Sequence, residues 1–106
     1  MERVFQALSE PTRRALLERL RSEGALSLSE LSAPLAMSRQ AVTKHLEVLR
    51  SAGLIEIERR GRERIHTLNP EPLEAVNAWL EPYSAAWDRR LERLRRHLEE
   101  DDDRDD

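Results

Sequence analysis

The sequence predicts a mainly α-helical domain that carries one small, two-stranded antiparallel β-hairpin. Apolar residues recur at helical spacing over most of the chain. Residues 54–68 instead alternate apolar and polar side chains, as half-buried strands do, and a glycine at position 61 interrupts them where a hairpin turn is expected. A length of 106 residues suits one domain.

The composition is that of a globular protein with a highly charged surface, since 39% of the residues are hydrophobic and 37% are charged. The chain contains no cysteine, which excludes disulfides and thiolate metal sites. No apolar run approaches the roughly 20 residues that span a bilayer. The N-terminus also lacks the apolar segment of a signal peptide. We therefore expect a cytoplasmic protein that does not contact membranes.

The formal net charge of −3 hides an uneven distribution along the chain. Residues 99–106 hold seven acidic residues and one arginine, a charge of −6, which leaves +3 on residues 1–98. The acidic segment is too charged and too poor in apolar residues to pack. We therefore expect a folded domain over residues 1–98 and a disordered acidic tail over residues 99–106. The mildly basic domain is compatible with nucleic-acid binding.

Start and stop signals divide the first half of the chain into four helices. These are a short stripe at residues 4–8, a helix from Pro11 to Glu23, a short helix from Ser27 to about Ala36, and a helix from Arg39 to about Ala52. Ser9, Ser27 and Ser38 can cap the helices that follow them. Gly24 and Gly53 can end the second and fourth helices.

The second half of the chain begins with the predicted hairpin, with strands at residues 54–59 and 63–68 around Arg60-Gly61-Arg62. A proline-containing segment at residues 69–72 then starts a long helix that can run to Leu98. Three helices followed by a two-stranded wing form the plan of a winged helix-turn-helix.

The helix that follows Ser38 is the predicted recognition helix. Val42, Leu46 and Leu49 share one face, which would anchor the helix in the core. Arginine can fork onto guanine, glutamine onto adenine, and threonine can contact a base or the thymine methyl group. Lysine and the helix N-terminus suit phosphate. The predicted DNA-contacting residues here are Ser38, Arg39, Gln40, Thr43, Lys44 and His45.

An ordinary solvated helix face is the alternative interpretation of those polar residues. His45 lies near the edge of the core face, where a half-buried structural role or a phosphate contact is favoured over metal ligation.

Four arginines crowd around Gly61 in the predicted wing. They are Arg59, Arg60, Arg62 and Arg64. Such a cluster repels itself without an anionic partner, so the pattern favours a wing that lies along the phosphate backbone or in the minor groove. A soluble, charged turn is the alternative.

With these elements in place, the sequence resembles the arsenical-resistance-repressor (ArsR) family of bacterial transcriptional regulators over roughly residues 3–98. The resemblance rests on residues 7–14 (Ala-Leu-Ser-Glu-Pro-Thr-Arg-Arg) and on residues 37–55, which include the Ser38–Leu54 block. It implies a homodimeric winged-helix repressor whose first and last helices pair between subunits. It also implies that residues 38–45 read bases.

Many members of that family sense metals, and this sequence departs from their patterns. The cysteines that one type carries before the recognition helix are absent. Another type combines Asp-x-His with a later His-x-x-Glu; His97 and Glu100 match the second half, but Ser84 and Ala86 stand where the first half is expected. We therefore predict the metal-independent branch, with no metal site and no cofactor, and with any small-molecule effector unknown.

The last helix carries a near-heptad apolar stripe, with Pro82 expected to kink or break it. About 26 helical residues span about 39 Å, longer than so small a domain can cover, so part of the stripe must be buried elsewhere. Both tryptophans and the single tyrosine lie in this helix, which suits an interface. The predicted dimer interface comprises Val4, Leu8, Leu73, Val76, Leu80, Tyr83, Trp87, Leu91, Leu94 and Leu98.

Together these features predict a transcriptional regulator that binds a specific double-stranded DNA operator as a homodimer, with repression inferred from the family resemblance. The alternative is a winged-helix protein-interaction module that does not bind DNA. An enzyme is disfavoured, because His45, His66 and His97 have no meaningful spacing to a nucleophile and no phosphate-binding loop is present.

Overall fold

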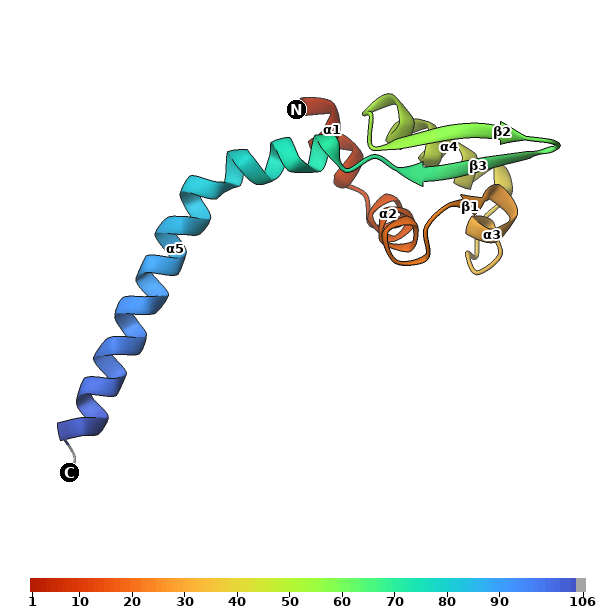
Figure 1. Cartoon of the computed structure of the whole chain (residues 1–106). Coiled ribbons are helices and arrows are strands. Elements are labelled where there is room, and N and C mark those ends of the chain that lie inside the picture. The colour runs from red at the N-terminus through yellow and green to blue at the C-terminus, as the bar shows by residue number, and fades with distance from the viewer. Residues whose placement is uncertain (105–106) are drawn as a thin grey trace. The chain divides into compact units, whose positions relative to one another are not determined.

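The computed structural model describes the backbone of residues 1–104 and the side chains of residues 1–100 (Figure 1). The elements are α1 (Glu2–Leu8), α2 (Pro11–Glu23), β1 (Leu26–Ser27), α3 (Leu28–Ser32), α4 (Arg39–Ser51), β2 (Ile55–Arg60), β3 (Glu63–Leu68) and α5 (Glu71–Arg104). The chain divides into an N-terminal unit, Met1–Ala75, and a second unit formed by the part of α5 that follows. The prediction of a mainly helical winged domain is confirmed.

The core of the N-terminal unit is built from the apolar faces of its helices and of the sheet. Its buried hydrophobic residues are Val4, Ala7, Leu16, Leu17, Leu20, Leu26, Leu31, Val42, Leu46, Leu49, Leu54 and Ile55. Full burial of one such leucine or isoleucine is worth about 1.5–3 kcal/mol relative to exposure. Helices this short are marginally stable alone, so packing in the shared core stabilises them and sets their positions.

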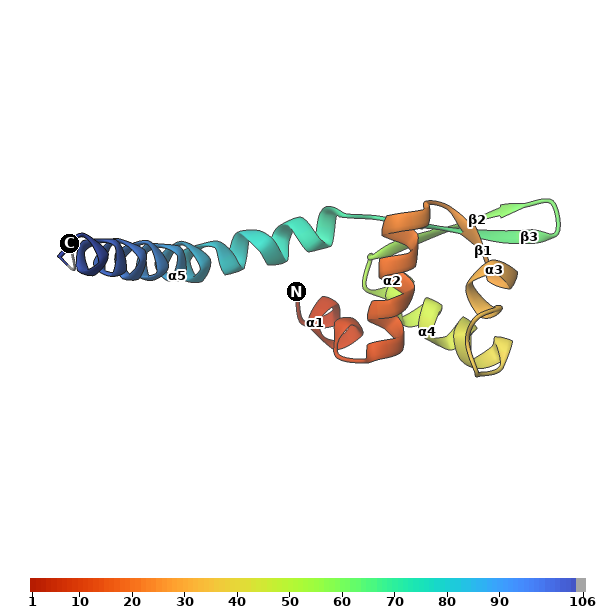
Figure 2. The same ribbon diagram turned by 90° about the horizontal axis from the view of Figure 1, so that it is seen from below.

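The sheet has three strands rather than the predicted two, in the order β1-β3-β2, and both pairings are antiparallel. The added strand is the two-residue β1, in which Leu26 pairs with His66 and Ser27 with Ile65. Two residues are too few to show the alternation by which strands are recognised in a sequence. Figures 1 and 2 both show the β2–β3 turn projecting past the helices as a wing.

The wing turns on two residues, because Arg60 pairs directly with Glu63 and leaves only Gly61 and Arg62 between the strands. Gly61 has φ of 62°, whereas no non-glycine residue in the described chain has a positive φ. A positive φ at the first turn position alone is the arrangement of a type II′ hairpin, which requires glycine there.

Two predicted N-caps are confirmed. The Ser27 hydroxyl accepts from the Glu30 N–H at 3.2 Å while the Glu30 carboxylate accepts from the Ser27 N–H at 3.0 Å, which forms a capping box. The Ser38 hydroxyl accepts from the Ala41 N–H at 3.1 Å at the start of α4.

The predicted N-cap of α2 is wrong by one residue. The Glu10 carboxylate accepts from the Arg13 N–H, whereas Ser9 ends α1 and donates its hydroxyl to the Gln6 carbonyl at 2.6 Å. Serine is a preferred N-cap residue and glutamate is not, which is why the sequence indicated Ser9.

Helix α3 ends at Ser32, four residues before the predicted end near Ala36. Pro34 has no N–H with which to continue the helical hydrogen bonds. The carbonyls of Glu30 and Leu31 instead accept from the Arg19 guanidinium of α2, at 2.9 and 3.2 Å.

Helix α5 continues past Leu98, where its end was predicted, to Arg104. Pro82 lies inside the helix, so the break that was one of the two expectations does not occur, and the kink stays a prediction. The division into a domain of residues 1–98 and an acidic tail of residues 99–106 stays a prediction, and its last two residues lie outside the described chain. No described helix is both long enough and apolar enough to cross a membrane.

His66 is the one buried histidine of the described side chains, with 2% of its surface exposed. Its Nδ1 lies 3.1 Å from the Leu26 carbonyl across the β1–β3 pair, so Nδ1 carries the proton that this carbonyl accepts. Burial lowers the pKa of His66 below its ordinary 6.5, with a smaller contribution from the charge of Arg64 and against an opposing effect of the Leu26 hydrogen bond. The fold therefore favours the neutral ring.

We predict that the free energy of unfolding decreases as the pH falls below 6.5. Above that pH the ring is neutral in both states; below it the unfolded chain binds a proton that the folded protein disfavours. Urea unfolding at about pH 7.5 and about pH 5.5 measures the decrease. His66→Gln should reduce this decrease. An equal decrease in wild type and His66→Gln would contradict the assignment.

Candidate nucleic-acid interface

One face of α4 is fixed in the core, as predicted. Val42 and Leu49 are 0% exposed and Leu46 is 1% exposed. Because the helix repeats every 3.6 residues, burial of these three side chains determines which side chains point outward.

The outward face of α4 gathers the polar side chains that the sequence assigned to DNA. Arg39, Gln40, Thr43 and Lys44 are exposed and line one shallow surface hollow of about 510 Å³. The Thr43 hydroxyl donates to the Arg39 carbonyl at 2.8 Å, which leaves its methyl group and its oxygen lone pairs for another molecule. The side chain can therefore contact a thymine methyl group or accept a hydrogen bond.

Two arginines of the wing share a hollow with an arginine of α4. One hollow of about 230 Å³ is lined by Arg39 of α4, by Ser29 near the start of α3, and by Arg62 and Arg64 of the wing. The Arg39 guanidinium donates to the Ser29 hydroxyl. This contact connects α3 to the first turn of α4 and holds a cation beside the wing arginines.

Strand alternation assigns a side to Arg59, Arg60 and Arg64, and Arg62 of the turn lines the hollow shared with Arg39. Ile57 pairs with His66 on the face that packs on α4, and the next pair on that face is Arg59 with Arg64. Arg60 therefore points to the opposite face, where it lies 3.4 Å from Glu58. Of the four predicted wing arginines, Arg60 alone turns away from the recognition helix.

Glu47 is a charged residue of this face that the sequence-based site omitted. The hydrogen bond from Arg50 lowers the pKa of the Glu47 carboxyl, burial opposes this, and the charges of Arg50 and Arg64 lower the pKa further. Glu47 is therefore a carboxylate between α4 and the wing. A carboxylate repels phosphate but can accept from a cytosine amino group. Its outward spacing with Thr43 was the available sequence signal.

His45 is half-buried and lies against α2 rather than on the outward face. Its Nδ1 lies 3.3 Å from an Arg13 nitrogen and 3.8 Å from a Glu10 carboxylate oxygen. A structural contact therefore occupies the ring atom nearest α2, and a phosphate contact by His45 stays a prediction.

The predicted dimer residues fall into three groups by their exposure. The assignment of Val4 to the dimer interface is corrected, because Val4 is 7% exposed and packs in the chain's own core, where α1 meets α2 and α4. Leu8, Leu73 and Val76 are half-buried. The remaining residues of the α5 stripe are exposed, namely Leu80, Tyr83, Trp87, Leu91, Leu94 and Leu98.

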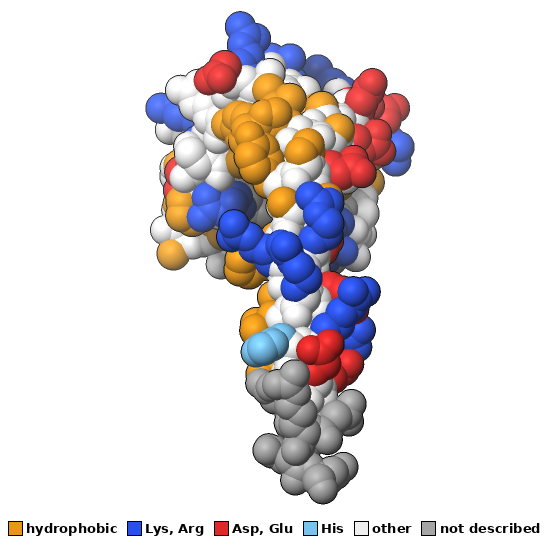
Figure 3. All heavy atoms as spheres, turned by 90° about the vertical axis from the view of Figure 1, so that its left-hand side faces the viewer, with side chains coloured by type: hydrophobic (Ala, Val, Ile, Leu, Met, Phe, Trp, Pro, Cys, Tyr) orange, Lys and Arg blue, Asp and Glu red, His pale blue; other side chains and the backbone are white. Residues whose placement is uncertain are grey.

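Hydrophobic side chains follow one edge of α5 and charged side chains follow the other (Figure 3). Trp79 is also exposed, and its ring centroid lies 5.6 Å from that of Tyr83. The sequence stripe did not include Trp79, because it is adjacent to Leu80 rather than at heptad spacing.

Within the described side chains, no group of three His, Cys, Asp or Glu residues could hold a metal ion. That the protein binds no regulatory metal stays a prediction, which rests on the sequence pattern at residues 84–100.

Comparison with known proteins gives consistent similarities. Residues 8–58 match the family described as "Helix-turn-helix domain". The HTH-type transcriptional regulator Rv2034 of Mycobacterium tuberculosis is 40% identical over 90 residues, which cover 85% of this chain and 80% of that protein. The transcriptional repressor SdpR of Bacillus subtilis is 30% identical over 80 residues, 76% of this chain and 88% of that protein. The crystal structure of an ArsR family transcriptional regulator superposes with a TM-score of 0.73 and 40% identity, covering 82% of this chain and 89% of that chain.

We predict that Arg62→Ala weakens binding to all duplex DNA and reduces the salt dependence of log Kd by about one unit, because one phosphate contact is lost. Arg60→Ala is the matched control: it removes the same charge two positions away, on the opposite face of the wing. Fluorescence anisotropy over a salt series measures both. An effect of Arg60→Ala as large as that of Arg62→Ala would contradict the assignment of faces.

Proposed function

The chain belongs to the ArsR family of helix-turn-helix transcriptional regulators, and from this we propose that it binds an operator as a homodimer and represses transcription. Regulators of this family bind DNA and are not known for catalysis, and we propose no enzymatic activity for this chain. We propose the cytoplasm as its location, where bacterial DNA is accessible to it.

The observation that carries the proposal is the shared side of α4 and the wing. Arg39 of α4 lines one hollow with Arg62 and Arg64 of the wing and a second with Gln40, Thr43 and Lys44. Thr43 and Arg64 also line a common hollow. A duplex presents base edges flanked by phosphates, and this surface presents base-reading groups flanked by guanidinium groups. A protein-interaction module would not need this pairing of functions.

We assign base reading to Gln40 and Thr43 and backbone contacts to the wing. Gln40 can pair with adenine in a bidentate manner, and Thr43 offers its methyl group to thymine. Arg59, Arg62 and Arg64 can neutralise phosphates or enter the minor groove. Ser38 caps α4 through the Ala41 N–H, and the other N–H groups of the first turn favour a phosphate.

The homodimer follows from the exposed stripe on α5. Leu91, Leu94 and Leu98 are each between 46% and 56% exposed, at a spacing typical of helix pairing. Two copies would present two α4 helices to one face of a duplex, at half-sites about 34–36 Å apart. Repression is supported by the name of SdpR, a transcriptional repressor similar over 76% of this chain.

The decisive experiment is selection of bound duplexes from a random pool, followed by anisotropy with the selected duplex and a scrambled one over a salt series. The proposal predicts a two-fold-related motif, tighter binding to the selected duplex, and an affinity that falls steeply with salt. An absence of enrichment and of salt-dependent binding would overturn it in favour of the protein-interaction module.

We predict that Gln40→Ala weakens binding to the selected duplex by about 1–3 kcal/mol and relaxes the base preference at one position of each half-site. Repeating the selection with the variant measures the change. If Arg62→Ala abolished the base preference while Gln40→Ala and Thr43→Ala left it unchanged, the roles assigned to the helix and the wing would have to be exchanged.

We predict a dimer of about 25 kDa, twice the 12.4 kDa of one chain, in sedimentation at micromolar concentration. Leu91→Glu combined with Leu94→Glu should shift the protein to monomer and weaken DNA binding, because charges would have to be buried between the helices. Arg89→Glu, on the opposite side of α5, is the control and should stay dimeric. A wild-type monomer would contradict the prediction.

A further inference from the structure

Arg13 of α2 contacts two other helices at the same time. Its Nε donates to the Ala7 carbonyl at 2.7 Å, and one terminal nitrogen donates to the Gln6 carbonyl at 3.1 Å, both at the end of α1. Its other terminal nitrogen lies 3.3 Å from Nδ1 of His45 on α4. All three nitrogens of the guanidinium are thus engaged, and the planar group fixes their relative directions.

The chemistry of arginine determines the state of His45 in this contact. A guanidinium only donates hydrogen bonds, so Nδ1 of His45 must accept and the proton of the neutral ring lies on Nε2. The Glu10 carboxylate, 3.8 Å from the same Nδ1, provides a balancing negative charge beside Arg13. Burial raises the pKa of Glu10 and the hydrogen bond from the Arg13 N–H lowers it, and the pKa is lowered overall, which favours the carboxylate.

The neighbouring Arg14 offers a natural comparison. It donates to the Leu8 carbonyl at 2.7 Å and so satisfies a free carbonyl at the end of α1, as Arg13 does. None of its described hydrogen bonds reaches α4. Arg13 and Arg14 therefore share a capping role, and the bond to the recognition helix distinguishes Arg13.

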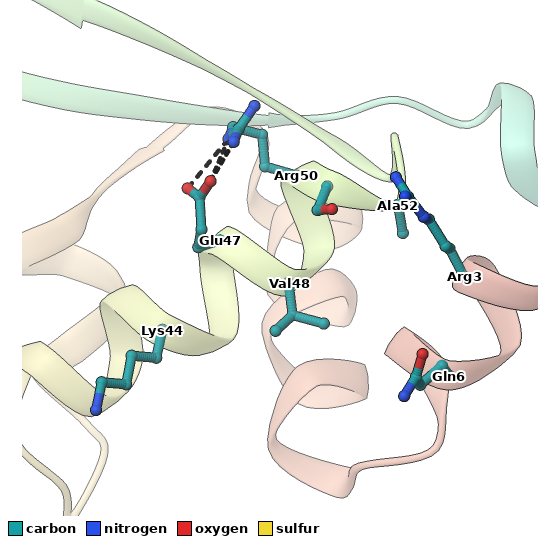
Figure 4. Close-up of a pocket in the computed structure, with 8 residues that line it drawn as sticks. Arg3, Gln6, Lys44, Glu47, Val48, Arg50 and Ala52 are labelled. Atoms are coloured by element: carbon teal, nitrogen blue, oxygen red, sulfur yellow. Dashed lines mark hydrogen bonds and ion pairs between the residues drawn. The ribbon is translucent and has the colours of Figure 1, made fainter.

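α1 and α4 pack together in the core and also border an open groove. Figure 4 shows Arg3 and Gln6 of α1 across an open groove from Val48 of α4. The groove has a volume of about 580 Å³, and its other lining residues come from the second half of α4 and the residue after it. The bridge through Arg13 is a directed polar contact that joins the end of α1 to the middle of α4, in addition to the apolar packing of the two helices.

We propose that Arg13 is a positioning residue that, within the orientation set by the buried face of α4, fixes the fine rotation of the recognition helix through His45 and thereby tunes its base preference. His45 lies one position after Lys44 and two positions after Thr43. A fixed His45 ring therefore also fixes the direction in which those two side chains leave the helix. Specific contacts require placement within about 0.5 Å and 10–20°. The inference rests on the proposed DNA binding and adds a specificity-determining residue that does not touch the DNA.

The test compares Arg13→Gln with the matched control Arg14→Gln. For each variant the readouts are the free energy of unfolding and the ratio of affinities for the selected and scrambled duplexes. Both variants should lose stability. Only Arg13→Gln should lower the affinity ratio, by at least about fivefold, the lower end of what one well-placed base contact contributes.

A second variant pair keeps the proposal testable if Arg13→Gln does not fold. His45→Leu removes the acceptor and should lower the affinity ratio as Arg13→Gln does, and the double variant should show little further loss. His45→Gln provides an oxygen that can accept from Arg13 and should retain more of the ratio than His45→Leu.

The outcomes separate this inference from the proposed function. A wild-type protein without preference for any duplex would overturn both. A wild-type preference that survives Arg13→Gln and His45→Leu would overturn the positioning role alone. Equal reductions of the ratio by Arg13→Gln and Arg14→Gln would also overturn it, because capping of α1 would then account for the effect.

Discussion

Burial of one face of α4 is the constraint on which the rest of the N-terminal unit depends. Val42, Leu46 and Leu49 are almost completely removed from solvent, and rotation of the helix would expose them at a cost of several kcal/mol. The same burial holds the polar face outward. The α4 surface is therefore preorganised for a ligand by the hydrophobic core, without any contribution from the ligand itself.

In the wing, the alternation of side chains along each strand determines which of them face α4. Ile57 and His66 pack toward α4, and the two-residue period of a strand carries that orientation outward to Arg59 and Arg64. The same period sends Arg60 to the other face. A cluster that looks uniform in the sequence thus separates into two groups, and only one of them extends the surface of α4.

The sequence predicted the elements that carry strong periodic signals. The core face of α4 and its Ser38 cap are confirmed, because several residues at fixed spacing report on them. The two-residue β1 and the early end of α3 could not be predicted, since the first depends on pairing with His66, 40 positions away, and the second on Arg19 replacing the helical hydrogen bonds. The Arg13–His45 contact likewise joins residues 32 positions apart and leaves no local pattern.

The central claim is that the exposed face of α4 and the adjacent wing arginines together form the DNA-binding surface. It is tested most directly by nuclear magnetic resonance of the nitrogen-labelled protein during titration with the selected duplex. The account predicts large shifts of the Gln40 side-chain amide and of the Arg62 and Arg64 Nε–H signals, with little change at the Arg60 Nε–H. Saturating binding that leaves the Gln40 and Arg62 signals in place would contradict the account.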